Sequence, residues 1–233
     1  MLVVFGSMPS SEPRARPRPP GIVVGMHAEA RLLNGSGLAV AIGGGTPAGA
    51  TAAAERLLAD GAPALISLGL AGGLAPSLRP GACIIPSAVI HDGVTYPADP
   101  ALLATLGGQT AELLVATGSA VISASDKAAL FTATGAAAVD LESGAVAMTA
   151  ARHGVPFAVL RIVCDPAWRD LPPAALAGLD SSGRIVLLPL LVSLLRAPWQ
   201  LGALLRLGGD ARVARGALAA AVKRLEPGDG VTR

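Results

Sequence analysis

The sequence is poor in aromatic residues, in charged residues and in cysteine. Aromatic residues make up 3% of the 233 residues and charged residues 15%, whereas 52% are hydrophobic. Because aromatic rings are scarce beside abundant alanine, leucine, glycine and valine, we expect a core of small aliphatic side chains packed at close backbone approach. A chain of this length and apolar content buries a sizeable core, which predicts one globular α/β domain and argues against two.

The low charge and the few cysteines exclude several classes of function. The formal net charge is +2, and several arginines lie among the first eighteen residues, so the remainder is nearly neutral and lacks a nucleic-acid-binding surface. Cys83 and Cys164 are too few and too distant in sequence for a disulfide framework or a zinc site, which fits a reducing cytoplasm. The three histidines share no ligand spacing. We therefore expect no metal and no cofactor.

The N-terminal segment 1–20 differs from the rest of the chain. Its apolar start is too short for a signal peptide, and proline, serine and arginine follow without periodicity, which predicts a disordered tail. A start codon placed too early is an alternative that the sequence leaves open. We expect the domain to span 21–226 and to be followed by a short tail, 227–233.

Short β-rich runs alternate with helical patterns from Gly21 onward. The expected strands lie at 21–26, 38–44, 64–70, 83–90, 113–122 and 157–164. Helices are expected at 47–61, which opens with proline and closes with glycine, and at 141–154. This alternation predicts a three-layer α/β/α domain with a mixed central sheet.

The C-terminal region, 184–226, predicts apolar helices broken at Pro189, at Pro198 and at the Gly208–Gly209 pair. About 20 apolar residues suffice to span a bilayer, but Arg196 and the two prolines argue against a spanning helix. Two interpretations remain. The helices are part of the core, or 184–215 forms an exposed apolar surface, edged by arginines and carrying Trp199, that rests on an anionic membrane.

Glycines and one acidic residue stand where the first expected strands meet their loops, which is where open α/β sheets bind ligands. Glu29 follows the first strand, the run from Gly43 to Gly45 follows the second, and Gly72 ends the third. Each has a structural explanation as well. A carboxylate is favoured in the first turn of a helix by the dipole, and glycines serve tight turns and close packing.

Three further acidic residues lie at the ends of later strands. Asp140 and Glu142 stand between a strand and an apolar helix; helix capping explains Asp140 but leaves Glu142 without a role. Asp165 ends the strand of "IVCDPAWRD", beside Cys164 and before proline. Loss of solvent there is expected to raise the Asp165 pKa, so that the carboxyl group holds a proton near neutral pH. A turn or N-cap aspartate is the alternative.

These motifs, in this order, resemble those of one known family. "GMHAEARLL", "GGGTPAGATAAAERLL", "SLGLAGGLAP", "AVDLESGAVA" and "VLRIVCDPA" resemble successive motifs of the nucleoside phosphorylase superfamily, in the branch of the methylthioadenosine and S-adenosylhomocysteine nucleosidases. The resemblance runs from about residue 21 to residue 165. Within that superfamily the Ala-rich, Pro-rich sequence most resembles the hopanoid-associated phosphorylase group, thought to remove adenine from adenosylhopane.

The resemblance implies a role for each acidic residue. Asp165 would protonate the purine at N7, Glu142 would accept the ribose hydroxyls, and Glu29 would orient the attacking water. The remaining substrate-binding residues that it implies are Leu141, Gly72, Gly45 and Thr46. Breaking an N-glycosidic bond leaves a sugar cation and a base anion, so this chemistry needs an acid at the base and carboxylates at the sugar. The implied partner is a small nucleoside, lipid-linked in the hopanoid case, and the implied assembly is a homo-oligomer.

The sequence departs from the family at two places. The strand end reads Ser67-Leu68-Gly69-Leu70, without the arginine and serine that hold phosphate in hexameric bacterial phosphorylases. Phosphate as co-substrate is therefore disfavoured, although the backbone amides from Gly43 to Thr46 remain available to an anion. Cys164 replaces a serine that nucleosidases often carry, which predicts less hydrogen-bond support for Asp165.

Several functions stay open at this stage. The first alternative to cleavage of adenosylhopane is an ordinary methylthioadenosine/S-adenosylhomocysteine nucleosidase or purine nucleoside phosphorylase. The second is a non-catalytic nucleoside-binding or lipid-binding protein. A pure binder would not need Glu29, Glu142 and Asp165 together, so the sequence favours an enzyme.

Overall fold

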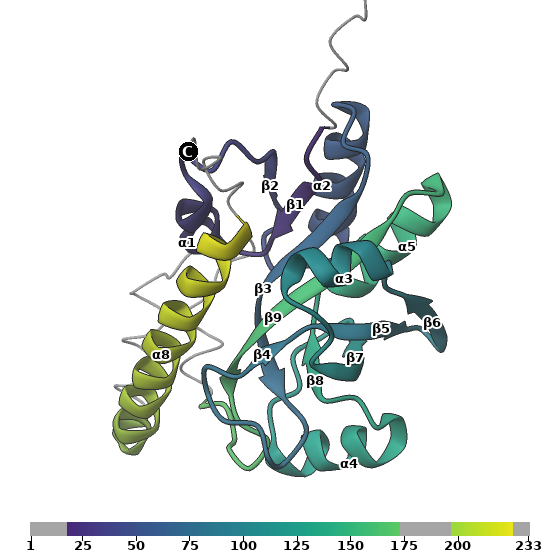
Figure 1. Ribbon diagram of the computed structural model, residues 1–233. Coiled ribbons are helices and arrows are strands. Elements are labelled where there is room, and N and C mark those ends of the chain that lie inside the picture. The colour runs from purple at the N-terminus through teal and green to yellow at the C-terminus, as the bar shows by residue number, and fades with distance from the viewer. Residues whose placement is uncertain (1–17, 173–196, 226–233) are drawn as a thin grey trace, which may run out of the picture.

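The computed structural model describes residues 18–172 and 197–225 (Figure 1). The strands are β1 (Gly21–Val24), β2 (Val40–Ile42), β3 (Leu65–Gly73), β4 (Cys83–Ile84), β5 (Pro86–His91), β6 (Val94–Pro97), β7 (Ala111–Ala116), β8 (Ala138–Asp140) and β9 (Phe157–Asp165). The helices are α1 (His27–Ala30), η1 (Arg31–Leu33), α2 (Pro47–Ala59), α3 (Pro100–Leu106), α4 (Ala124–Thr134), α5 (Ser143–His153), η2 (Pro198–Gln200) and α8 (Leu201–Leu225).

The strands form one mixed sheet in which β3 is the central member. The sheet runs β2-β1-β3-β8-β7-β5-β6, and β9 pairs with β3 and β4. The first part of β3 lies parallel to β1 and β9, whereas its last two residues, Gly72 and Gly73, pair antiparallel with β8. Strand β3 therefore brings the ends of β1, β8 and β9 to one place.

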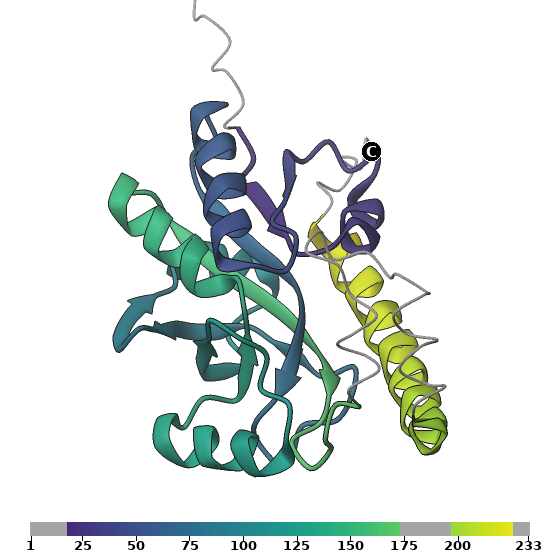
Figure 2. The same ribbon diagram turned by 180° about the vertical axis from the view of Figure 1, so that it is seen from behind.

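Helices cover both faces of this sheet, as the period of two along each strand requires. Val23 of β1 packs in the cluster that contains α2 and α5, whereas Ile22 packs in the cluster that contains α3 and α8. Figures 1 and 2 show α8 along one side of the sheet and α2 with α5 across the other. The contact face of α2 consists largely of alanine, which confirms the expectation of a core built from small side chains.

The expected strands 21–26 and 38–44 are observed as the shorter β1 and β2, and two others depart further from the prediction. The run 83–90 divides into β4 and β5 because the Ile85 N–H donates to the Thr110 hydroxyl, at 2.7 Å, rather than to a neighbouring strand. The run 113–122 ends at Ala116, and the Thr117 N–H then donates to the Asp140 carbonyl. Residues 117–122 form a loop that covers the site described below. Strand β6 and helices α3 and α4 were not predicted.

The predicted break at Gly208–Gly209 is wrong, because α8 continues through both glycines as one helix of 25 residues. Only its second half is a core helix, with Ala214, Leu218 and Val222 buried against the sheet. Its first half is largely exposed. Residues 1–17 of the predicted tail 1–20, residues 184–196 of the predicted membrane-contacting segment 184–215, and the tail 227–233 lie outside the described residues. No helix among those described has the length and apolarity that crossing a bilayer requires.

Candidate active site

A cavity of about 290 Å³ opens where β1, β3, β8 and β9 end. Its lining contains Glu29, Asp140, Glu142 and Asp165, four acids that come from the ends of three strands, β1, β8 and β9. The predicted binding residues Gly45, Gly72 and Leu141 also line it. Strands that are distant in the sequence thus converge on one concave site, the kind of place where α/β sheets bind ligands.

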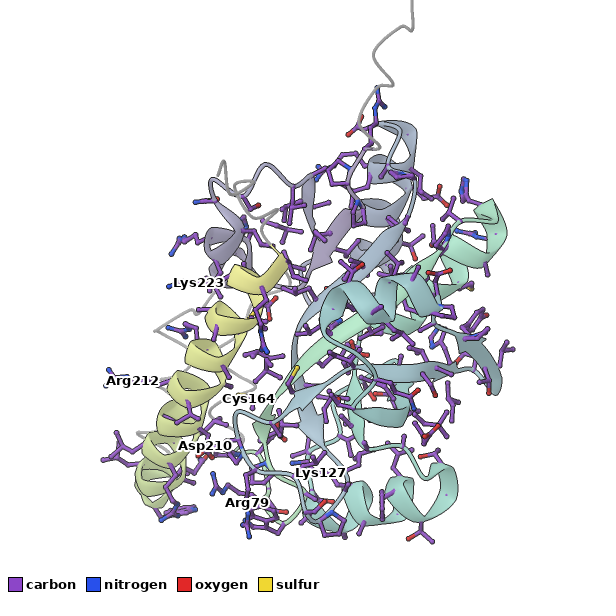
Figure 3. All side chains as sticks on the ribbon, viewed as in Figure 1. Arg79, Lys127, Cys164, Asp210, Arg212 and Lys223 are labelled. Atoms are coloured by element: carbon purple, nitrogen blue, oxygen red, sulfur yellow. The ribbon has the colours of Figure 1, made fainter. Side chains whose placement is uncertain are left out.

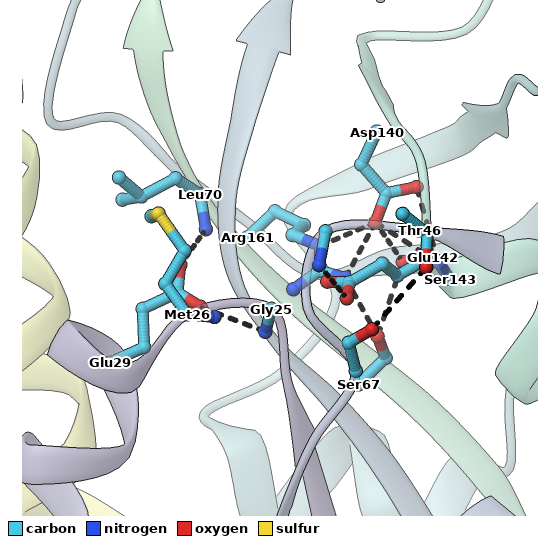
Figure 4. A network of polar contacts seen from close by, with 12 residues as sticks. Gly25, Met26, Glu29, Thr46, Ser67, Leu70, Asp140, Glu142, Ser143 and Arg161 are labelled. Carbon is cyan, nitrogen blue, oxygen red and sulfur yellow. Dashed lines mark hydrogen bonds and ion pairs between the residues drawn. The ribbon is translucent and has the colours of Figure 1, made fainter. Parts of the chain in front are cut away.

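Glu29 is held entirely by backbone groups (Figure 4). Its Oε2 accepts hydrogen bonds from the N–H groups of Gly25 and Met26, both at 2.9 Å, and its Oε1 accepts from the Leu70 N–H at 3.0 Å. The side chain closes a capping box at the start of α1 and ties the end of β1 to β3. Burial raises the pKa of Glu29, against the lowering influence of Arg161 and the three N–H donors.

Glu142 reaches across to the ends of β1 and β2. Its Oε1 accepts a hydrogen bond from the Gly45 N–H at 3.0 Å. A Cβ atom on Gly25 would lie 2.5 Å from Glu142 Oε2, and one on Gly43 would lie 2.6 Å from Oε1. Glycine at these two positions therefore makes room for the carboxylate. Burial, opposed by Arg161 and reinforced by Asp140 and Glu29, raises the pKa of Glu142 to about 7.

Asp140 has the structural role that capping predicts, and a second partner. Its carboxylate accepts from the Ser143 N–H and, at 2.6 Å, from the Ser143 hydroxyl at the start of α5. The same Oδ2 receives the Arg161 guanidinium, with Nε at 2.7 Å and Nη2 at 2.6 Å. Asp140 therefore fixes Arg161 and leaves Glu142 free to face the cavity.

Arg161 is the cation at the centre of the carboxylates. It is 1% exposed, and its Nη2 also donates to the Ser67 hydroxyl at 2.7 Å and lies 4.0 Å from Glu142 Oε2. Although burial disfavours a charged guanidinium, Asp140, Glu142 and Glu29 together raise the pKa of Arg161. One positive charge thus serves three carboxylates at this end of the cavity.

The sequence prediction did not include Arg161. The available signal was an arginine in the middle of the apolar strand "FAVLRIVCD". A charge within a buried strand needs partners, and these come from β3, β8 and the start of α1. The sequence therefore indicated that Arg161 needs negatively charged or polar partners, but it did not indicate which residues these are.

Asp165 stands at a β-bulge. The pairing of β9 with β3 shifts between Ala71 and Gly72. Ala71 pairs with Val163 and Gly72 with Asp165, so Cys164 is the extra residue of the bulge. Bulges beside a site redirect side chains, and here the bulge accompanies an Asp165 carboxyl group that lines the cavity. Burial raises the pKa of the Cys164 thiol to about 12, and the charge of Asp165 raises it further in the same direction. Cys164 therefore stays protonated.

The surroundings of Asp165 differ from the apolar setting expected from the sequence. Lys127 of α4 places its Nζ 2.5 Å from Asp165 Oδ2. The Lys127 side chain is fully buried, and its Nζ also donates to the carbonyls of Pro166, at 3.2 Å, and Arg169, at 2.9 Å. A buried lysine therefore contacts the carboxyl group of Asp165, which the sequence pattern did not predict.

Lys127 was also missed, because α4 was not recognised as a helix. The signal was "SASDKAAL", in which Ser123 caps the helix by accepting from the Asp126 N–H at 3.0 Å. A lysine in the first turns of such a helix usually faces water. Only the approach of β9 in three dimensions turns this lysine inward.

Thr46 is placed differently from the other predicted residues. Its hydroxyl accepts from the Gly49 N–H at 3.2 Å and so caps the N-terminus of α2. Gly45, its neighbour, lines the cavity. Among residues 18–172 and 197–225, no group of histidine, cysteine, aspartate or glutamate side chains is arranged to hold a metal ion.

Comparison with known proteins identifies the family. A family model described as the Phosphorylase superfamily matches residues 22–176. The chain therefore belongs to the phosphorylase superfamily, and it is an N-glycosidic bond-cleaving enzyme of the nucleosidase or nucleoside phosphorylase type. A search of curated proteins finds no match.

Solved structures share the fold. The chain resembles the 5'-methylthioadenosine/S-adenosylhomocysteine nucleosidase of Neisseria meningitidis with 18% identity and a TM-score of 0.66, over 89% of this chain and 98% of that one. The S-adenosylhomocysteine nucleosidase of Streptococcus pyogenes gives 17% identity and 0.64, over 91% and 99%. The futalosine hydrolase of Helicobacter pylori gives 19% identity and 0.61, over 90% and 99%. These likenesses confirm the predicted mixed α/β fold.

Proposed function

We propose that the chain is a nucleosidase that releases adenine from an adenosyl compound, with water as the nucleophile. The observation that carries the proposal is the distribution of charge along the cavity. Three carboxylates share the single cation Arg161 at one end, and the Lys127–Asp165 pair lies at the other. The first end suits a sugar that becomes cationic, and the second suits a base that needs a proton.

Glu29 has the geometry of a group that binds and activates water. A carboxylate offers about four acceptor positions, and backbone N–H groups occupy three of those on Glu29. The remaining position is available to a water molecule, since Glu29 lines the cavity. Its raised pKa makes it a better acceptor of the proton that water loses on attacking the ribosyl carbon.

Several contacts disfavour phosphate as the nucleophile. The Gly45 N–H, which an anion would need, donates to Glu142. The Arg161 guanidinium is engaged by Asp140 and Ser67. A phosphate anion would enter beside Glu29 and Glu142 with no uncommitted cation of the described residues to meet it, and like charges at this distance repel.

The proposed roles of the other residues follow from where they lie. Glu142 accepts hydrogen bonds from the ribose hydroxyls, and its approach through Gly25 and Gly43 places it deep in the cavity. Asp165 passes a proton to N7 of the departing adenine; Lys127 holds its Oδ2, which leaves Oδ1 for the base. Gly45, Gly72 and Leu141 line the cavity as binding residues. Thr46 contributes through its cap on α2.

The finer proposal is that the adenosyl compound is adenosylhopane, with methylthioadenosine or S-adenosylhomocysteine as the alternative. Its support, beside the resemblance to the hopanoid-associated group, is a set of exposed apolar side chains on η2 and the first half of α8: Trp199 is 78% exposed, Leu205 68% and Val213 55%. These side chains suit contact with a membrane that holds a lipid-tailed substrate. Binding to anionic vesicles in a co-sedimentation assay, lost in Trp199→Ala, tests this contact; wild-type protein left in the supernatant at low salt contradicts it.

Release of base from a panel of nucleosides tests the proposed function. The wild type should liberate adenine from at least one of methylthioadenosine, S-adenosylhomocysteine and adenosylhopane, and Asp165→Asn should not. Saturable binding without release of any base would instead identify a nucleoside-binding protein. Light scattering on the same preparation tests the expected homo-oligomer.

A further inference from the structure

We propose that Lys127 holds the proton that Asp165 delivers to the departing base, so that the two side chains act together as the acid of the site. This inference rests on the proposed function, since it concerns the same step. It assigns a role to a buried lysine on α4 that none of the motifs contains. Figure 3 shows Lys127 on the side of the domain where α4 meets the end of β9.

The hydrogen bonds of Lys127 show where the proton of the pair lies. The Nζ atom has three partners, Asp165 Oδ2 and the carbonyl oxygens of Pro166 and Arg169, and the two carbonyls are acceptors only. An ammonium group with three donors satisfies all three partners beside an Asp165 carboxylate, and a neutral amine, with two donors and one lone pair, satisfies them beside a protonated Asp165. In either arrangement one proton lies between Lys127 Nζ and Asp165 Oδ2. We take the ammonium and carboxylate pair as the resting arrangement, because a carboxyl group is ordinarily the stronger acid.

In that state the transferable proton lies on Lys127 and not on Asp165. As the bond between the ribosyl carbon and N9 breaks, its electron pair moves onto the purine. Lys127 gives its proton to Oδ2 of Asp165, which leaves a neutral amine beside a neutral carboxyl group. Rotation of this group about its Cβ–Cγ bond turns the protonated oxygen toward the base, and the proton passes to N7, which restores a carboxylate. Water supplies the hydroxyl group of the ribosyl product, and its proton passes to Glu29. Solvent returns the proton to Lys127 after release.

The charged and titratable groups around the pair are few. Cys164 lies next to Asp165 on β9, but burial raises its pKa to about 12. Asp170 accepts from the Ala124 N–H at the start of α4, and Asp126 of the same helix bonds Ser123 at the surface. The guanidinium of Arg169 turns to Asp210 of α8. Among these described groups, Lys127 is the one that donates to Asp165.

The wild-type protein offers a direct test, because the chain contains only two lysines, Lys127 and Lys223. Lys223 is exposed on α8, and Figure 3 shows the two far apart. Lysine labelled with ¹³C at Cε gives one NMR signal for each, and Lys223→Met assigns them. The proposal predicts a Lys127 signal of the ammonium form at neutral pH, whose titration coincides with the alkaline decline of kcat. A neutral amine at pH 7, or a decline of kcat while Lys127 stays ammonium, overturns it.

Substitution of Lys127 separates proton delivery from structural support. In Lys127→Met only the carboxyl group can hold the proton, and a carboxyl group releases it at lower pH than an ammonium group. The alkaline decline of kcat should move to lower pH by about two units or more, with a loss of roughly 10²-fold at pH 8. A uniform loss with the decline unmoved would show a structural role only and overturn the proposal.

Lys127→Arg and Lys223→Met complete the set. Arginine keeps the charge and the donors but does not release a proton in proteins, so Lys127→Arg should remain roughly 10²-fold slow; full activity in this variant contradicts proton delivery. Lys223→Met should match the wild type. If Lys127→Met and Lys127→Arg keep normal rates while Asp165→Asn is inactive, the lysine proposal fails and the proposed function stands.

Discussion

The two ends of the cavity solve the problem of buried charge in opposite ways. At the end near β1 and β8, Glu29, Asp140 and Glu142 share one buried arginine, and the pKa values of Glu29 and Glu142 rise. At the end near β9, Asp165 has a lysine to itself. The first end therefore carries excess negative charge and the second is balanced. Excess negative charge stabilises a ribosyl cation, whereas a balanced pair holds a proton that can be given away.

The largest expected effect comes from removing the acid at the balanced end. Asp165→Asn keeps the volume and an acceptor for Lys127 but has no proton to donate. The rate of adenine release should fall by roughly 10³-fold, measured by chromatography of the free base on any nucleoside that the wild type cleaves. An unchanged thermal melting profile would confirm that the fold is intact. Near-normal turnover would remove Asp165 from the mechanism.

Removing the shared cation Arg161 should destabilise the protein at the end of the cavity near β1 and β8. Arg161→Leu leaves three buried carboxylates without a positive partner, which should destabilise the protein by about 3–5 kcal/mol. For a domain of this size the melting temperature should fall by roughly 6–20 °C. The matched control is Arg152→Leu, because Arg152 bonds Glu55 at the surface with 53% of its side chain exposed; this change should shift stability by less than about 1 kcal/mol. Equal effects of the two substitutions would contradict the account of Arg161.

Glu29→Gln sharpens the comparison, because it keeps the shape of the side chain and removes its ability to take a proton from water. The glutamine oxygen still accepts from the Gly25 and Met26 N–H groups, whereas the bond from the Leu70 N–H is lost because an amide NH2 group cannot accept it. We expect kcat to fall by roughly 10²-fold with KM little changed. A large rise in KM with kcat preserved would instead make Glu29 a binding residue.

Glu142→Gln should weaken substrate binding and, at high pH, stabilise the fold. The folded-state pKa of Glu142 is raised from 4.5 to about 7, so the wild type loses stability as the pH rises from 4.5 through 7. Glutamine escapes this loss, which amounts to up to about 3 kcal/mol. Denaturant unfolding should therefore show the variant to be more stable at pH 8 and nearly equal at pH 4.5, with KM roughly tenfold higher. A stability difference independent of pH would contradict the raised pKa.

The sequence predicted the three-layer fold and the acidic residues, because both follow from local patterns. Glycines and acids at strand ends are visible in a string of letters, and parallel strands bring such ends together. The cations Arg161 and Lys127 could not be assigned in that way. Burying a cation is favourable only where carboxylates from distant segments converge, and Lys127 has the local signature of an exposed helical residue.

The loop 117–122 and the continuous α8 show a second limit of local patterns. "LLVATGSAVI" has the composition of a strand throughout, but only its first part finds a partner in β8 and β5. The rest crosses the cavity, where Thr117 and Val121 form part of the lining. Pairing partners, rather than propensity, decide where this strand ends.

The source of the oxygen on the sugar product tests the central claim most directly. The wild type is incubated with an accepted nucleoside in H₂¹⁸O, with and without inorganic phosphate, and the ribosyl product is analysed by mass spectrometry. An excess of carboxylates around the sugar predicts a free ribosyl product that carries one ¹⁸O and forms at the same rate in both reactions. A ribosyl 1-phosphate, formed at a rate that rises with phosphate, would contradict the account.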